Sequence, residues 1–223
     1  MGRVALMARK RASRPARPLR AASVAILVGL ALSACGGSSP APTSATSQAT
    51  SSSAIPAALI RERRPIGRGA RFTPPARGPV IGACRGSLGR PRGVHVEVFA
   101  ADRVVLIPAG IGTRPPRARF EGRISHARCY GALVTLDPTG VVLVRSGAAL
   151  TLADLFRSWG QPLSSRRLAT FAAPAGGRVS VFVGGRRWRG APGSVPLRPH
   201  AEIVLEVGPH VPPHASYTFP PGT

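Results

Sequence analysis

Residues 129–147 constrain the fold more strongly than any other stretch, because they predict two apolar strands joined by a tight turn. The turn is Asp137-Pro138-Thr139-Gly140. Proline sets the first central φ of a type I turn, and the aspartate before it can bond the backbone beyond. The stretch therefore predicts a β-hairpin, and its strands carry almost no side chain that could do chemistry.

Further strands and one helix are predicted around this hairpin. Short apolar or alternating runs at 94–100, 103–110, 178–185 and 201–208 favour strands, with an irregular arginine-rich connection between 110 and 129. A helix is predicted at 151–160, with a capping pair, an apolar face and a glycine stop. The residues are Thr151 with Asp154, then Leu152, Leu155, Phe156 and Trp159, then Gly160. Together these elements predict an α+β domain, a small mixed or antiparallel sheet with one main packed helix and one disulfide.

The first 34 residues predict a lipoprotein signal peptide. Seven of the 31 basic residues precede the apolar run 21–34, which is too short for a stable membrane span. The run ends in Leu32-Ser33-Ala34-Cys35, which resembles the lipobox of bacterial lipoproteins. That resemblance implies that Cys35 becomes the first mature residue, carries acyl chains such as palmitate and anchors the protein to the extracytoplasmic face of the cell membrane. An ordinary secreted protein with a chance cysteine near its cleavage site is the alternative.

Composition divides the rest of the chain into three parts. Residues 35–60 hold the anchor and an uncharged tether rich in serine, threonine, alanine and proline. Residues 61–93 form an arm rich in arginine, glycine and proline, which we expect to extend over the domain surface and to be tied down at Cys84. Residues 94–223 form the α+β domain.

The net charge of +23 favours an anionic partner. Beyond the signal peptide, 24 arginines stand against eight acidic residues, although GC-rich coding drift accounts for part of this excess. Nucleic acid is scarce outside the cytoplasm, so it is disfavoured as a partner, and anionic lipid, wall polymer or an acidic protein is expected instead. The candidate contacts are Arg186, Arg187, Trp188 and Arg189, where an indole lies among three guanidiniums. A solvated turn is the alternative interpretation of this cluster.

The cysteines predict one structural bridge. With Cys35 lipidated, two cysteines remain for an oxidising compartment, so Cys84 and Cys129 are expected to form a disulfide. In the chain-entropy account such a bridge stabilises the fold by on the order of 4 kcal/mol. A redox or nucleophilic role is the alternative, but the chain has no C-x-x-C pair to support it.

The chain offers few groups for catalysis or metal binding. His95 and His126 are the candidate metal ligands, with copper or zinc as the ion and a third ligand that the pattern does not name. His210 and His214 have i, i+4 spacing, but in a proline-rich tail that spacing does not converge on one ion. No catalytic motif is present, so an enzyme is disfavoured; a hydrolase would need a buried carboxylate pair that the pattern does not reveal.

Five segments resemble a family of uncharacterised secreted bacterial lipoproteins of actinobacterial type. The matching pieces are VHVEVF, IPAGIG, CYGALVTLDPTGVVLVRS, TLADLFRSWGQPL and AEIVLEVG. The resemblance extends from about His95 to the C-terminus, more than half of the chain, and the Pro-Ala-Gly-Ile-Gly and Trp-Gly-Gln-Pro-Leu pieces are the most specific. The family has no assigned activity, so the resemblance implies a fold and an extracytoplasmic location only.

The departures from that family concern its histidines. Its members carry His-Thr-His-Asp before the turn and a histidine and a glutamate after it, where this chain has Val134, Leu136, Leu143 and Arg145. Of the clustered imidazoles only His95 persists. If the family's histidines bind a metal, this chain has kept the hairpin and lost most of the ligands. If they do not, the hairpin is simply buried and the resemblance is one of fold.

The sequence therefore predicts a lipid-anchored extracytoplasmic binding or interaction module without catalytic activity. The alternative is an extracytoplasmic lipoprotein that binds copper or zinc. A metal-free module with no resident cofactor follows from the first hypothesis, and His95 with His126 carries the second.

Overall fold

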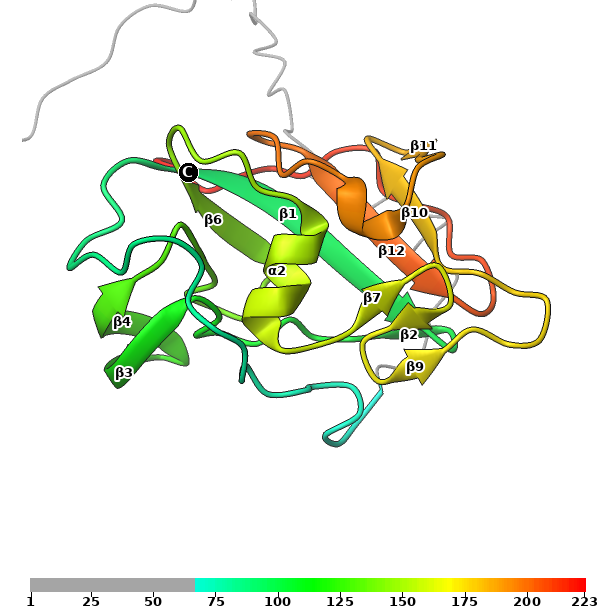
Figure 1. Ribbon diagram of the computed structural model, residues 1–223, viewed down its shortest axis with the longest axis horizontal. Helices are drawn as coiled ribbons and strands as arrows, with labels where there is room; N and C mark the ends of the chain where they lie inside the picture. The colour runs from blue at the N-terminus through cyan, green and yellow to red at the C-terminus, as the bar shows by residue number, and fades with distance from the viewer. Residues whose placement is uncertain (1–66) are drawn as a thin grey trace, which may run out of the picture. The chain divides into compact units, whose positions relative to one another are not determined.

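A computed structural model describes residues 67–223 of the chain (Figure 1). The predicted signal peptide, Cys35, the tether and the first residues of the arm lie outside the described residues. Among the described residues, no helix is both long enough and apolar enough to cross a membrane.

A seven-stranded mixed sheet forms the centre of the domain. Its order is β11-β10-β12-β1-β6-β5, and β2 pairs with the end of β1. β1 and β12 are parallel, and the other pairs are antiparallel. The strands are β1 (Pro91–Ala100), β2 (Arg103–Val104), β5 (Leu133–Val134), β6 (Val141–Arg145), β10 (Ser180–Val183), β11 (Arg186–Arg187) and β12 (Glu202–Val207).

The one α-helix among residues 67–223, α2 (Leu152–Trp159), lies across one face of this sheet (Figure 1). Asp154 accepts hydrogen bonds from the backbone N–H and the hydroxyl of Thr151 at the helix start. Gly160 ends the helix in the left-handed conformation, with φ of 77°. The predicted helix and its two boundary signals are therefore confirmed, and so is the α+β class.

The face of the sheet beneath α2 is apolar. The helix contributes Leu155, Phe156 and Trp159, all at most 1% exposed. Alternate strand residues meet them, because successive side chains of a strand point to opposite faces. They include Val94, Val96 and Val98 of β1 and Ile203 and Leu205 of β12. Burial of such side chains stabilises by roughly 1.5–3 kcal/mol each, so this layer holds the fold together.

The predicted hairpin at 129–147 is confirmed, with β5 and β6 as its paired strands. The expected irregular connection before it is wrong, because residues 113–130 form a second hairpin of β3 (Thr113–Phe120) and β4 (Arg123–Tyr130). Its buried positions, Ile124 and Ala127, lie on one face among exposed arginines. The predicted strand at 103–110 is short, because only β2 forms there.

Three short strands and a 3₁₀ turn complete the domain. A small antiparallel sheet follows α2, and the 3₁₀ turn precedes β12. They are β7 (Leu163–Ser164), β8 (Arg167–Leu168), β9 (Phe171–Ala172) and η1 (Pro192–Ser194).

The disulfide between Cys84 and Cys129 is present, with Cα atoms 5.3 Å apart, as predicted. Next to it the backbones of Arg85 and Tyr130 exchange hydrogen bonds of 2.9 and 2.7 Å. Further back, the indole N–H of Trp159 donates to the carbonyl of Pro74 at 2.9 Å. Residues 72–85 therefore contact the helix end and β4 at several points.

Candidate functional site

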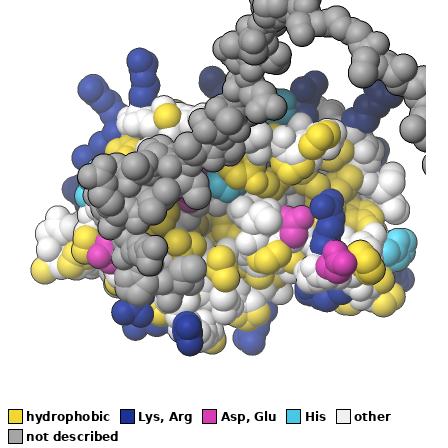
Figure 2. All heavy atoms as spheres, turned by 180° about the vertical axis from the view of Figure 1, so that it is seen from behind, with side chains coloured by type: hydrophobic (Ala, Val, Ile, Leu, Met, Phe, Trp, Pro, Cys, Tyr) yellow, Lys and Arg dark blue, Asp and Glu magenta, His cyan; other side chains and the backbone are white. Residues whose placement is uncertain are grey.

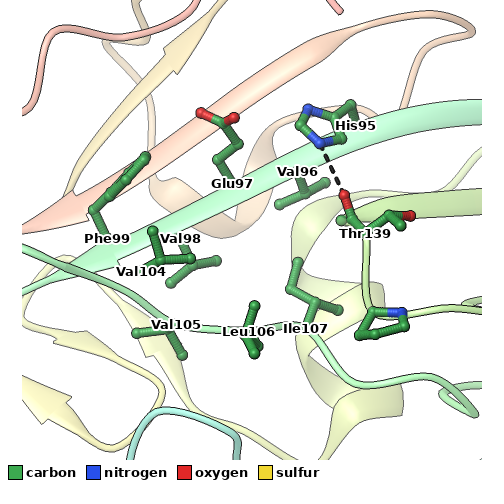
Figure 3. A pocket seen from close by; sticks show the side chains of 12 residues that line it. His95, Val96, Glu97, Val98, Phe99, Val104, Val105, Leu106, Ile107 and Thr139 are labelled. Atoms are coloured by element: carbon green, nitrogen blue, oxygen red, sulfur yellow. Dashed lines mark hydrogen bonds between the residues drawn. The ribbon is translucent and has the colours of Figure 1, made fainter. Parts of the chain in front are cut away.

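The second face of the central sheet carries charged side chains beside a smaller apolar cluster. His95 and Glu97 alternate with the core valines of β1, and Glu202 and Glu206 alternate with the core residues of β12. Figure 3 shows the side chains of His95 and Glu97 on the opposite side of β1 from those of Val96 and Val98. The parallel register places His95 directly beside Glu202.

His95 is held from both ring nitrogens and is only 5% exposed. Its Nδ1 lies 2.7 Å from Oε2 of Glu202, and its Nε2 lies 3.1 Å from the carbonyl of Thr139 (Figure 3). A carbonyl only accepts, so Nε2 carries a proton. The short contact between Nδ1 and Oε2 is a hydrogen bond between the imidazole and the carboxyl group.

The turn of the predicted hairpin supplies the group that orients His95. Gly140 has φ of +83°, and a Cβ there would lie 2.7 Å from the Val96 carbonyl and 3.0 Å from Nε2 of His95. The Gly140 carbonyl accepts from the Val96 N–H at 2.9 Å. Only glycine fits this left-handed position so close to the backbone of β1. The turn therefore packs against β1 and presents the Thr139 carbonyl to the imidazole.

Glu202 is a buried carboxylate with one unsatisfied oxygen. The residue is 3% exposed, and its Oε1 has no hydrogen-bond partner among the described residues. Burial raises the pKa of Glu202 above its ordinary value, and the hydrogen bond from His95 partly offsets that rise. An unpartnered buried carboxylate oxygen is costly, so this atom points to a missing positive or donating group.

Glu97 completes a cluster with His95 and Glu202. Ligand-type atoms of the three residues lie within 4.8 Å of one another. Nδ1 of His214 lies 2.7 and 2.8 Å from the two carboxylate oxygens of Glu97. The cluster thus brings one imidazole and two carboxylates together on the sheet, with a second imidazole beside them.

The C-terminal segment 208–223 covers this face. The Tyr217 ring stacks on the His95 ring at 3.7 Å between centroids, with 10° between the planes. His210 pairs with Glu206 at 2.8 Å, and Val211 is buried, with its N–H donating to Glu206 at 2.9 Å. Burial raises the pKa of Tyr217, with smaller contributions from the nearby carboxylates. The segment has neither helix nor strand, and its two tail histidines contact different glutamates.

The chemistry of this cluster suits a divalent transition metal. Zinc and copper take imidazole nitrogen and carboxylate oxygen as ligands, at about 2.0–2.2 Å from zinc. Ligand atoms around such an ion are roughly 3–4 Å apart, so the three residues need shifts of about 1 Å or less. The unsatisfied Oε1 of Glu202 already fits such an ion.

A small pocket of about 130 Å³ lies along the same strand. Its lining includes His95 and Glu97, with residues 104–107 and the turn residues 138–140 on its other sides (Figure 3). The pocket lies where β1 lacks a strand neighbour, between β2 and β6. It is lined mainly by apolar side chains.

The structure does not bring the two predicted metal ligands together. His126 is exposed on β4, opposite Ala118, whereas His95 is buried on β1. Glu97, Glu202 and His214 were not predicted as ligands. The only available signal was a polar residue between apolar neighbours in the runs VHVEV and AEIVLEV, which predicts a strand with one polar face.

The hairpin positions that differ from the resembled family lie on β5 and β6 or just after β5. Val134 and Leu143 belong to a second apolar cluster, which also contacts Tyr217. The guanidinium of Arg145 donates to the carbonyls of Tyr130 and Gly131, both at 3.1 Å. These positions therefore pack or brace the hairpin.

The predicted arginine cluster lies at the outer edge of the sheet. Arg186 and Arg187 form the exposed strand β11, and Trp188 is half-buried against the core. Figure 2 shows the molecule from behind relative to Figure 1. Arginine side chains project at many points of this rear face, with few carboxylates among them.

No family model, curated protein or solved structure matches this chain. The resemblance to the secreted lipoprotein family therefore stays a prediction.

Proposed function

We propose that this protein is a lipid-anchored extracytoplasmic binding module without catalytic activity, and that its ligand is a divalent transition metal ion, copper or zinc. The ligands are the imidazole of His95 and the carboxylates of Glu97 and Glu202. His214 contacts Glu97 and lies beside these three ligands.

The unsatisfied Oε1 of Glu202 is the observation that carries this proposal. Two carboxylates within 4.8 Å of each other and of one imidazole create a demand for positive charge, because like charges at short range repel. The hydrogen bond with His95 meets only part of it. A divalent cation would satisfy all three side chains at once.

Competing with this proposal is a purely structural role, in which the histidine–carboxylate pairs only hold the C-terminal segment in place. The pair of His210 and Glu206 fits that role well, because the Val211 N–H gives Glu206 a second donor. Glu202 lacks such a second donor among the described residues, which favours a ligand at Glu202 and not at Glu206.

Calorimetric titration of the purified, disulfide-intact protein with Zn²⁺ and Cu²⁺, after treatment with a chelator, tests the proposal. We expect one ion to bind per chain. His95→Ala and Glu202→Gln should each abolish this binding or weaken it at least tenfold, because each removes one of three ligands.

His126→Ala is the matched control, since His126 is an exposed histidine outside the cluster. It should bind metal like the unaltered protein. Absence of stoichiometric binding, or equal losses in His126→Ala and His95→Ala, would contradict the proposed site.

The lipid anchor is tested separately, because Cys35 lies outside the described residues. Cys35→Ala should move the protein from the membrane fraction to the soluble fraction, since acyl chains supply the anchoring free energy. If Cys35→Ala stays in the membrane fraction, the protein is held there by something else. Anionic lipid, wall polymer or a protein partner would then be the next candidates, and nucleic acid remains disfavoured.

A further inference from the structure

A second hollow lies on the domain, at the end of the sheet that carries β11. Its volume is about 380 Å³, and it lies between the segments at 178–181 and 187–192. Its side chains include Arg178, Arg187, Arg189 and Trp188, with Ser165 and Ser180 beside them.

The charge of this hollow is all of one sign. Three of its lining residues are arginines, and no carboxylate lines it. None of the ion pairs between described residues includes Arg178, Arg187 or Arg189. Guanidiniums present several N–H groups in a fixed plane and bind phosphate oxygens in pairs. The hollow therefore suits a phosphate group.

Besides two serines, the remaining lining includes apolar side chains that suit a compact ring. Trp188 packs against the core, and its Nε1 lies 3.4 Å from the hydroxyl of Ser194, so the indole is held in place. Val179, Val181 and Pro192 complete the wall. Indole rings provide a large rigid apolar surface on which the C–H face of a sugar can pack. A hollow of this size suits one small ligand better than the flat surface of a large partner.

We propose that this hollow binds a phosphorylated sugar or polyol unit. Arg178, Arg187 and Arg189 bind the phosphate, and Trp188 packs against the carbon skeleton. The unit is either free in solution or a repeat of a phosphate-bearing wall polymer. This site shares no residue with the metal cluster, so either proposal can fail without the other.

The structure also separates Arg186 from its neighbours in the predicted cluster. Arg186 pairs across from Val183 and does not line the hollow, whereas Arg187 and Arg189 do. Arg178, which the sequence pattern did not single out, joins them from the preceding loop. Arg186 is therefore a matched control of equal charge on the same strand.

Tryptophan fluorescence of the purified protein during titration with glucose 6-phosphate, glucose or inorganic phosphate tests the proposal. Trp159 is fully buried away from the hollow, so a change in fluorescence on ligand binding reports on Trp188. We expect glucose 6-phosphate to bind at least about tenfold more tightly than glucose or phosphate at equal ionic strength. Arg187→Ala with Arg189→Ala should weaken it at least about tenfold, whereas Arg186→Ala should retain it.

Equal losses in Arg186→Ala and in the double variant would overturn the proposal, because diffuse surface charge would then explain the binding. So would equal affinity for glucose 6-phosphate and inorganic phosphate. Binding to phosphatidylglycerol vesicles that glucose 6-phosphate does not displace would also overturn it, in favour of a membrane surface.

Two further arms identify the source of the ligand. Binding of poly(glycerol phosphate) that glucose 6-phosphate displaces would support the proposal and assign the hollow to a wall polymer. Binding of glucose 6-phosphate without binding of the polymer would support it and assign the hollow to a free sugar phosphate.

Discussion

The two faces of the central sheet are built from the same strands, yet they differ in every physical respect. On one face, alternate residues of β1 and β12 are valine, isoleucine and leucine beneath α2. On the other, the intervening residues include His95, Glu97 and Glu202 beneath a proline-rich segment without regular structure. Both faces are largely buried, but the second combines a smaller apolar cluster with charged groups whose burial costs free energy.

This difference separates stability from chemistry within one sheet. Apolar burial under α2 stabilises the folded state, whereas keeping carboxylates out of water on the charged face lowers its stability. Functional sites commonly hold such groups at a cost in stability. Four changes, from the largest expected effect to the smallest, test the contrast.

Leu155→Ala on α2 should have the largest effect. Leu155 is fully buried between helix and sheet, so its truncation leaves a cavity, and we expect a loss of about 2–5 kcal/mol in the free energy of unfolding. Urea denaturation followed by circular dichroism measures it. A loss below about 1 kcal/mol would mean that the apolar face is not the source of stability.

Gly140→Ala should destabilise the charged face by about 2–3 kcal/mol, through backbone strain and contact with Val96 and His95. Gly147→Ala is the matched control, because Gly147 has nearly the same φ of +80° and a Cβ added there would meet no atom within 4 Å. In the same denaturation measurement, the free energy of unfolding of Gly140→Ala should be at least about 1 kcal/mol lower than that of Gly147→Ala. Equal losses of stability in the two variants would show that close packing of the turn against Val96 and His95 does not matter for stability.

Glu202→Gln should stabilise the metal-free protein near neutral pH by about 1 kcal/mol, because a neutral amide avoids burying a charge. Burial raises the pKa of Glu202, so the folded state holds this proton more tightly than the unfolded state. The protonated Glu202 carboxyl group therefore contributes its full share of the folding stability below the ordinary pKa of glutamate. This contribution is lost as pH rises through the pKa of Glu202 in the folded state.

The difference in the free energy of unfolding between Glu202→Gln and the unaltered protein should therefore be absent near pH 4 and increase as pH rises. Denaturation at a series of pH values, with chelator present, measures it. A gap that closes with rising pH would mean that the carboxylate is better solvated, or better paired, when folded than when unfolded.

Arg157→Ala should have the smallest effect, about 0.5 kcal/mol or less. Its guanidinium pairs with Asp154 at 2.9 Å on the outer face of α2, where the arginine side chain is 62% exposed. Thermal unfolding at low and high salt measures the loss. A loss above about 1 kcal/mol would show that exposed charges on the helix matter as much as its buried face.

Local signals predicted the elements of the fold well. The turn at 137–140, the capping pair at the start of α2 and the disulfide all rest on residues close in the chain or on compartment chemistry, and all are present. The β3–β4 hairpin escaped prediction because arginines and two consecutive prolines obscure its alternation. Its turn has positive φ at Glu121 and Gly122. Only the glycine indicates such a conformation in the sequence, and one glycine is a weak signal.

The candidate site was predictable only in part. His95, a predicted ligand, lies in the cluster, but its neighbours there come from another strand and from the tail. Finding Glu202 requires the register between β1 and β12, and local patterns carry no information on which distant strands pair. The same pattern that marks a polar strand face cannot say whether solvent or a second segment covers it.

The parallel pairing of β1 with β12 also determines how late in synthesis the domain can fold. His95 and Glu202 are neighbours in space but 107 positions apart in the chain. Until the last strand has emerged, β1 lacks its central partner and the apolar layer under α2 is incomplete. A chain that emerges from its N-terminus therefore lacks a finished core until β12 is available, which favours a single late folding event over stepwise folding during synthesis.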